Sequence, residues 1–457
     1  MPLVAGVDSS TQSVKVVVRD ADSGELVATS SAPHPEGTEV DPLAWEIALE
    51  QALAAVSDKK ISAISIAGQQ HGMVALDSNG LVIRKALLWN DTRSSSAADD
   101  LNREVPDIHI RTGSKLVASF TASKIRWLFD NEKESATRLA AVALPHDWLS
   151  WRLSDSTNIE DLFTDRSDAS GTGYFNPVSN QYDLEILDLV TRGKKDLRLP
   201  KIIAHDKFGG VSRSGIPIAS GAGDNAGAAL GLGARVGDLI ISLGTSGTAF
   251  AISRTPTNDA KGEIAGFADA TGNYLPLACT LNAAKVFASV ANLLKVDLDE
   301  FARLALQAES GAKGLRLLPH FDGERTPNRP DIRGNFSGIT HENLTAENIA
   351  RASIEGVIGG MVFAARALQR EGFSAERIFL IGGAAKSAAV QEVAASMFQS
   401  AIQLPQPSEY VADGAARQAA WALRGAPDWA IGNTKTIEPK IDGGEVTANY
   451  LELIAEL

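Results

Sequence analysis

Two copies of a strand–turn–strand unit, one at the start of the sequence and one near its middle, limit the folds open to this chain. In each copy, two short apolar runs rich in β-branched residues flank a polar turn, which predicts a pair of strands. The runs and turns are, in order, Leu3–Val7, Asp8–Ser13, Val14–Val18, Asp238–Leu243, Gly244–Thr248 and Ala249–Ile252. Amphipathic helical stretches follow both units, so the order predicts an α/β protein with a duplicated architecture.

The length agrees with more than one domain. The chain has 457 residues, whereas a single hydrophobic core usually serves about 150. A stretch containing Gly, Pro and Ser at Ser214–Ser220 precedes the second unit. We therefore expect an N-terminal domain over 1–218 and a C-terminal domain over 219–457.

Charge and cysteine content narrow the function classes. The formal net charge of −13 disfavours binding to nucleic acid or to an anionic membrane. Cys279 is the single cysteine, which excludes an intrachain disulfide and a multi-cysteine zinc site and fits a reducing cytoplasm. No run of about 18 uncharged apolar residues predicts a membrane span. The apolar start is too short for a signal peptide and reads as a strand. We expect a cytoplasmic enzyme with a small-molecule substrate.

The two turns are suited to nucleotide phosphates. Gly, Ser and Thr in a tight turn direct several backbone N–H groups and hydroxyls at one point, which forms an anion-binding nest. Asp8, at the exit of the first strand, adds a carboxylate where Mg²⁺ would lie between phosphates. The alternative reading of each turn is an ordinary hairpin.

The segment Gly221–Ala226 has three interpretations. It satisfies the dinucleotide fingerprint G-x-G-x-x-G/A, although Asp224 would oppose a pyrophosphate and the preceding apolar run is short. Alternatively, Asp224 is a general base that accepts a proton from a substrate hydroxyl as it attacks phosphorus. In the third interpretation the aspartate only caps the following helix.

Longer segments resemble the FGGY carbohydrate kinases, from Gly6 to about Leu423. Ser119–Asn131 is similar to the first family signature, including its Lys124 and Trp127, and Gly334–Glu355 is similar to the second. Shorter segments resemble the xylulokinases within this family. They are Ala67–Gly72, Leu88–Arg93, Ser167–Thr172, Gly223–Ala226 and Gly323–Pro327.

The resemblance implies the two-domain fold shared with actin, hexokinase and the Hsp70 ATPase, and ATP-dependent phosphorylation of D-xylulose to D-xylulose 5-phosphate. It implies Asp224 as the catalytic base and Asp8 as the Mg²⁺ residue. The sugar-binding residues that it implies are Gln70, His71, Trp89, Asp224 and Asn225. The implied ATP-binding residues are Thr11, Gln12, Ser13, Gly244, Thr245, Gly382, Gly383 and Lys386.

Three departures from the family pattern bear on these roles. Gln70 replaces a methionine, Ser10 a glycine of the first turn, and Ala384 a third glycine of the adenosine-side loop. Glu324 and Arg325 either form a structural ion pair or contact the substrate. A kinase for another ketose or polyol, a non-kinase ATPase of the same superfamily and a nicotinamide-dependent dehydrogenase remain alternatives. The oligomeric state is open, with a homodimer as one expectation.

Overall fold

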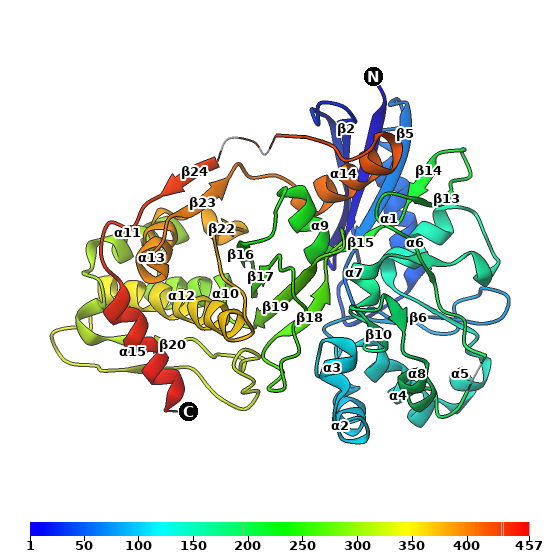
Figure 1. Cartoon of the computed structure of the whole chain (residues 1–457). Helices are drawn as coiled ribbons and strands as arrows, with labels where there is room; N and C mark the ends of the chain where they lie inside the picture. The colour runs from blue at the N-terminus through cyan, green and yellow to red at the C-terminus, as the bar shows by residue number, and fades with distance from the viewer. Residues whose placement is uncertain (195, 431, 433, 457) are drawn as a thin grey trace.

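Two seven-stranded sheets organise the chain in the computed structural model, which describes residues 1–194, 196–430, 432 and 434–456 (Figure 1). The first sheet contains β1 (Leu3–Ser9), β2 (Ser13–Asp20), β3 (Leu26–Pro33), β5 (Ile61–Gly68), β13 (Phe208–Val211), β14 (Pro217–Ala219) and β15 (Ala222–Gly223). The second contains β16 (Asp238–Leu243), β17 (Gly247–Ala251), β18 (Ala265–Ala268), β19 (Tyr274–Thr280), β22 (Arg377–Ile381), β23 (Ile402–Pro405) and β24 (Thr434–Ile437).

The expected duplication is present in the strand pairing. β1 pairs antiparallel with β2 and parallel with β5, while β16 pairs antiparallel with β17 and parallel with β22. In both sheets the antiparallel pair encloses one of the polar turns, and the parallel partner arrives after a helical crossover. The strand–turn–strand pattern therefore correctly predicted the central antiparallel strand pair of each sheet.

Alternating side chains of β1 pack against two helices on opposite faces of the first sheet. Ala5 and Val7 belong to the apolar cluster that contains Trp45 of α1 (Pro42–Ala54), whose N-terminus is capped by Asp41. Val4 points to the other face and packs with Ala416 of α14 (Tyr410–Arg424). Thus a helix from near the C-terminus lies against the N-terminal strands, as Figure 1 shows.

The second sheet is covered on one face by the 25-residue helix α12 (Ala346–Arg370), with Ile241 and Ile358 in the same cluster. On its other face, Ile240 and Phe250 share a cluster with Ala229 of α9 (Asp224–Gly231). Helix α9 thereby lies between the two halves. Its first residue is Asp224, so the fold carries the expected base to the junction.

The other elements surround these layers. The remaining helices are α2 (Ser95–Glu104), α3 (Ile108–Thr112), α4 (Thr121–Asn131), α5 (Lys133–Arg138), α6 (Pro145–Leu153), α7 (Arg166–Ala169), α8 (Leu184–Val190), α10 (Ala284–Leu294), α11 (Leu298–Gln307), α13 (Ala388–Phe398) and α15 (Gly444–Ala455). The short strands are β4 (Glu39–Val40), β6 (Val74–Leu76), β7 (Ala86–Leu87), β8 (Ala141–Ala143), β9 (Phe163–Thr164), β10 (Phe175–Asn176), β11 (Gln181–Tyr182), β12 (Lys201–Ile202), β20 (Arg316–Leu318) and β21 (Asn335–Ser337). Within the described residues, no helix combines the length and apolar character needed to cross a membrane.

The division between 218 and 219 stays a prediction. Strands β14 and β15 both belong to the first sheet, and the second sheet begins with β16 at Asp238.

Candidate active site

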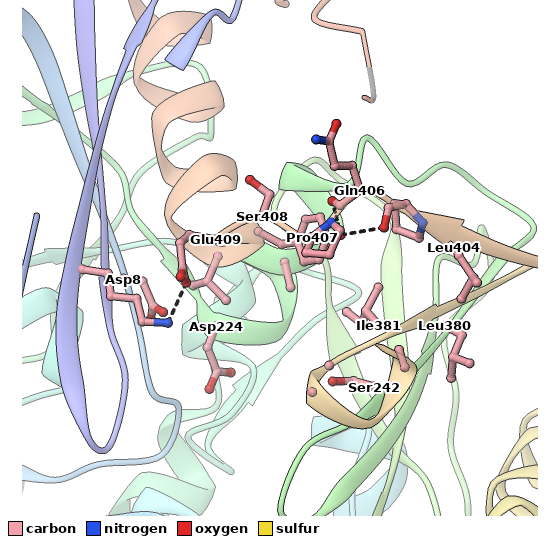
Figure 2. A pocket seen from close by; sticks show the side chains of 18 of the residues that line it. Asp8, Asp224, Ser242, Leu380, Ile381, Leu404, Gln406, Pro407, Ser408 and Glu409 are labelled. Carbon is pink, nitrogen blue, oxygen red and sulfur yellow. Dashed lines mark hydrogen bonds and ion pairs between the residues drawn. The ribbon is translucent and has the colours of Figure 1, made fainter. Parts of the chain in front are cut away.

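Two adjoining cavities occupy the space between the halves. The larger cavity, of about 1150 Å³, is lined by Asp8 and by the loop after β22. The smaller cavity, of about 760 Å³, is lined by Gln70, His71 and both polar turns. Asp224 and Asn225 line both cavities, and Figure 2 shows Asp224 beside Asp8 in the larger one. The Asp224 carboxylate therefore lies where molecules bound in the two cavities would meet.

The environment of Asp224 suits proton transfer. Removal from bulk water raises its pKa to about 6, against the opposing effect of two hydrogen bonds from Asn225. The backbone N–H and the Nδ2 of Asn225 donate to Oδ1 at 2.7 and 2.8 Å. The hydrogen bonds of the described residues leave Oδ2 without a donor, so this oxygen can accept a substrate proton. A carboxylate with a pKa near neutrality is effective as a general base.

Helix α14 holds the turn that leads to Asp224. The buried Gln418 side chain accepts the N–H of Gly221 at 3.0 Å and donates to the carbonyl of Gly221 at 2.7 Å. Further along, α9 crosses α14 so closely that a Cβ on Gly414 would lie 1.9 Å from the Gly227 carbonyl oxygen. The sequence analysis missed Gln418, because it lies 197 residues from its partner and carries no motif.

Short helix α7 contacts both the turn before the expected base and one of the expected sugar residues. Ser167 Oγ accepts the N–H of Gly223 at 3.1 Å, and the Ser167 carbonyl accepts Gln70 Nε2 at 3.1 Å. Behind this helix His146 is fully buried. Although burial alone would lower its pKa, the carboxylates of Asp147, Asp168 and Asp165 raise it to about 9. The surrounding carboxylates therefore favour the protonated form of the His146 ring, which lies beside the Asp165 cap of α7.

Asp8 has the properties expected of a residue that holds a cation. Its side chain is 5% exposed, and burial raises its pKa to about 7, with a further contribution from the negative charge of Asp224. Ser10 Oγ donates to Oδ1 at 2.5 Å and partly offsets this effect. No ion pair within the described part of the chain neutralises the Asp8 carboxylate. Carboxylate oxygen is a preferred ligand of Mg²⁺, so Asp8 fits the expected metal.

The loop after β5 places two polar side chains in the smaller cavity. His71 Nδ1 lies 2.6 Å from the carbonyl oxygen of Gly171, which can only accept, so Nδ1 carries the proton and Nε2 is an acceptor. Burial lowers the pKa of His71 to about 3, with contributions from the positive charges of Lys124 and Arg325, and the ring is therefore neutral. The rings of Phe120 and Phe267 contact the imidazole, with centroids at 4.8 and 5.5 Å.

The other expected residues also line the two cavities. The smaller one contains Thr11, Gln12, Ser13, Trp89, Gly244 and Thr245. The larger one contains Gly382, Gly383 and Lys386. At Gly382 the backbone is left-handed, with φ +92°, and a Cβ would lie 2.6 Å from the Leu243 carbonyl oxygen, so glycine is required there. The structure thus brings together every residue that the sequence assigned to the site.

The loop before the cis Thr326–Pro327 bond decides between the two readings of Glu324 and Arg325. Glu324 is buried and accepts the N–H of Leu281 at 2.7 Å and Nδ2 of Asn282 at 3.0 Å. Its carboxylate forms no ion pair with the guanidinium of Arg325 among the described residues. Arg325 is instead half-buried and lines the smaller cavity. Of the two side chains, Arg325 is the one placed to meet a substrate.

Comparisons with known proteins agree with this geometry. The N-terminal domain of the FGGY family of carbohydrate kinases matches residues 3–231, and the C-terminal domain of that family matches residues 239–423. A xylulose kinase of Streptomyces coelicolor is 41% identical over 448 residues, which cover 94% of this chain and 90% of the relative. A xylulose kinase of Escherichia coli is 31% identical, covering 84% and 82% of the two chains.

Solved structures give the same result. The crystal structure of xylulose kinase from Bifidobacterium adolescentis matches with a TM-score of 0.91 and 42% identity, covering 99% of both chains. Glycerol kinase from Plasmodium falciparum, at 20% identity and a TM-score of 0.88, has the same fold. The expected two-domain fold is confirmed, and the dehydrogenase alternative is excluded. The chain belongs to the FGGY family of carbohydrate kinases.

Proposed function

We propose that this chain transfers the γ-phosphoryl group of ATP to the C5 hydroxyl of D-xylulose and forms D-xylulose 5-phosphate. The observation that carries the proposal is the position of Asp224 on the shared wall of the two cavities. Relatives named xylulose kinases, at 41% and 40% identity over 94% of the chain, support the choice of sugar.

The smaller cavity suits a neutral polyol. Gln70, His71 and Asn225 offer amide and imidazole groups that donate and accept hydrogen bonds, which matches sugar hydroxyls. The neutral His71 contributes an acceptor at Nε2, and the Trp89 ring supplies an apolar wall for the C–H face of the sugar. In this arrangement the terminal hydroxyl faces Oδ2 of Asp224, which accepts its proton as the oxygen attacks phosphorus.

The polar turns and the loop after β22 would bind ATP. Thr11, Gln12, Ser13, Gly244 and Thr245 would surround the phosphates, while Gly382, Gly383 and Lys386 would contact the adenosine side. Mg²⁺ held at Asp8, through water, would neutralise phosphate charge. Because phosphoryl transfer passes through a loose transition state, positioning and charge neutralisation supply most of the rate.

A coupled ADP-release assay tests the proposal. The panel consists of D-xylulose, D-ribulose, L-ribulose, L-xylulose, L-fuculose and glycerol, and ³¹P NMR of the product locates the phosphate. We expect the highest kcat/KM with D-xylulose and phosphate on C5. A higher value with another member would assign another sugar, and equal ADP release without sugar would identify an ATPase. Light scattering during size-exclusion chromatography tests the expected homodimer, and fractionation of the producing cells tests the cytoplasmic location.

A further inference from the structure

The backbone of His71 has an unusual conformation. Its φ is +69°, in the left-handed region that side chains with a Cβ rarely adopt. Such a residue keeps this conformation only when its surroundings impose it. The ring is fixed by the Gly171 carbonyl, and the backbone carbonyl of His71 is fixed separately, by side chains of α4.

Two donors from the first turns of α4 converge on that carbonyl. Lys124 Nζ donates to the His71 oxygen at 3.2 Å and also to the carbonyl of Ser119. Thr121 Oγ1 donates to the same His71 oxygen at 3.2 Å. Both side chains are fully buried, and no ion pair of the described residues involves Lys124. Its ammonium group is therefore held by backbone carbonyls, with no carboxylate in contact.

A buried lysine of this kind lowers the stability of the folded state. Burial lowers the pKa of Lys124 to about 7, which expresses the cost of keeping a charge away from water. An apolar side chain of similar length would fill the space without this cost, so packing alone does not account for a lysine. What an apolar side chain cannot do is donate to the His71 and Ser119 carbonyls.

We propose that Lys124 is a positioning residue for sugar binding: it holds His71 in the left-handed conformation in which the imidazole lines the smaller cavity. This inference rests on the proposed function, since it takes His71 as a sugar contact. Lys124 does not line the cavity itself. Its effect on the sugar is therefore indirect and passes through the backbone of one residue.

The matched test compares K124M with S123A. Methionine preserves the length of the side chain and removes the donor. Ser123, the next residue on α4, is also buried, and its Oγ donates to the Val117 carbonyl at 2.9 Å, away from His71. We measure the KM for D-xylulose, the KM for Mg-ATP, kcat and the Tm of both variants.

K124M is expected to raise the sugar KM about tenfold or more and to leave the ATP KM within about twofold. S123A is expected to leave both unchanged, even where it lowers the Tm as much as K124M does. An unchanged sugar KM in K124M, or an equal rise in both KM values, overturns the proposal.

Two further measurements cover the other cases. If K124M does not fold, K124L is the second variant that removes the Lys124 donor, and an unchanged sugar KM in K124L overturns the proposal. If the wild-type chain phosphorylates no sugar of the panel, the proposed function has failed, and the crystal structure of K124M decides this inference separately. A φ of His71 that leaves the left-handed region supports it, and a retained positive φ overturns it.

Discussion

The indole N–H of Trp89 donates a hydrogen bond of 2.9 Å to Oγ1 of Thr11. A residue of the proposed sugar wall is thereby joined to a residue of the first phosphate turn, 78 positions away in the sequence. The contact gives the two proposed substrate sites a direct mechanical link on the N-terminal side of the cleft.

Replacing Trp89 with Phe keeps an aromatic wall and removes the donor. W89F is expected to raise the KM for Mg-ATP about threefold to tenfold, because a net hydrogen bond of this kind contributes about 1 kcal/mol. T11V should produce a similar rise, and the double variant should lose less than the product of the two, since both remove one bond. Fully multiplicative effects in a double-mutant cycle of KM values would show that the bond does not couple the sites.

The raised pKa of Asp224 predicts an acidic limb in the rate profile. The base must be ionised, and its pKa is raised to about 6. At saturating Mg-ATP, where the bound cation keeps Asp8 ionised, kcat/KM for the sugar should therefore fall about tenfold per unit below this pH. An ordinary aspartate would place the limb about two units lower. Steady-state rates between pH 4.5 and 8 measure the limb, and D224N should abolish turnover while ATP affinity stays within severalfold.

Gln70 is expected to influence which sugar is preferred. Its Nε2 is committed to the Ser167 carbonyl, which leaves the amide oxygen as the group that can meet a hydroxyl. Q70M restores the methionine of the xylulokinase pattern and removes that acceptor, so the KM values of the sugars should change by about threefold to tenfold and unequally. Q51M, on the exposed side of α1, is the control. An identical sugar profile for Q70M and the wild type would remove Gln70 from the specificity residues.

The proposed metal role of Asp8 can be measured without turnover. D8N keeps the size of the side chain and the contact with Ser10, but it removes the charge that attracts a divalent cation. Calorimetric titration should show that Mg²⁺ strengthens ADP binding to the wild type and has little effect on D8N. D22N, at a surface turn, should behave as the wild type. An equal Mg²⁺ effect in D8N would place the metal on other groups.

Local patterns in the sequence were sufficient to identify the two strand–turn–strand units, although the strands extend into the predicted turns: Asp8 and Ser9 belong to β1, and Gly247 belongs to β17. The strand Asp238–Leu243 has the predicted bounds, because a buried apolar run that ends in glycine leaves few alternatives. The candidate residues came largely from the family resemblance, and the structure brings them to two adjoining cavities. Their chemical roles stay predictions until the variants above are measured.

Contacts between residues far apart in the sequence could not be predicted from local patterns. Gln418 is an unremarkable residue of an amphipathic helix in the sequence, yet it fixes the Gly221 backbone in three dimensions. The left-handed backbone conformation of His71 could not be predicted from the sequence either, because a positive φ at a residue other than glycine is imposed by tertiary contacts and not by local propensity. Both features depend on helices that the sequence places far from the turn that they support.

The close approach of α14 to the first sheet gives a stability prediction with a functional consequence. A Cβ on Gly6 of β1 would lie 1.9 Å from the Ala412 carbonyl oxygen and 2.3 Å from the Ala416 nitrogen, so G6A must push the helix away from the strand. Backbone atoms cannot yield as a side chain does, and we expect a loss of at least about 2 kcal/mol in the free energy of unfolding.

G360A is the control for this substitution. On α12 the nearest atom to an added Cβ is the Tyr450 hydroxyl oxygen at 3.5 Å, an ordinary contact, and alanine favours the helix. Denaturant unfolding should therefore separate the two variants. Because α14 also carries Gln418, G6A should lower kcat in the folded fraction by disturbing the turn before Asp224, while G360A should not. A G6A variant with normal stability and normal kcat would contradict the packing of α14 on β1.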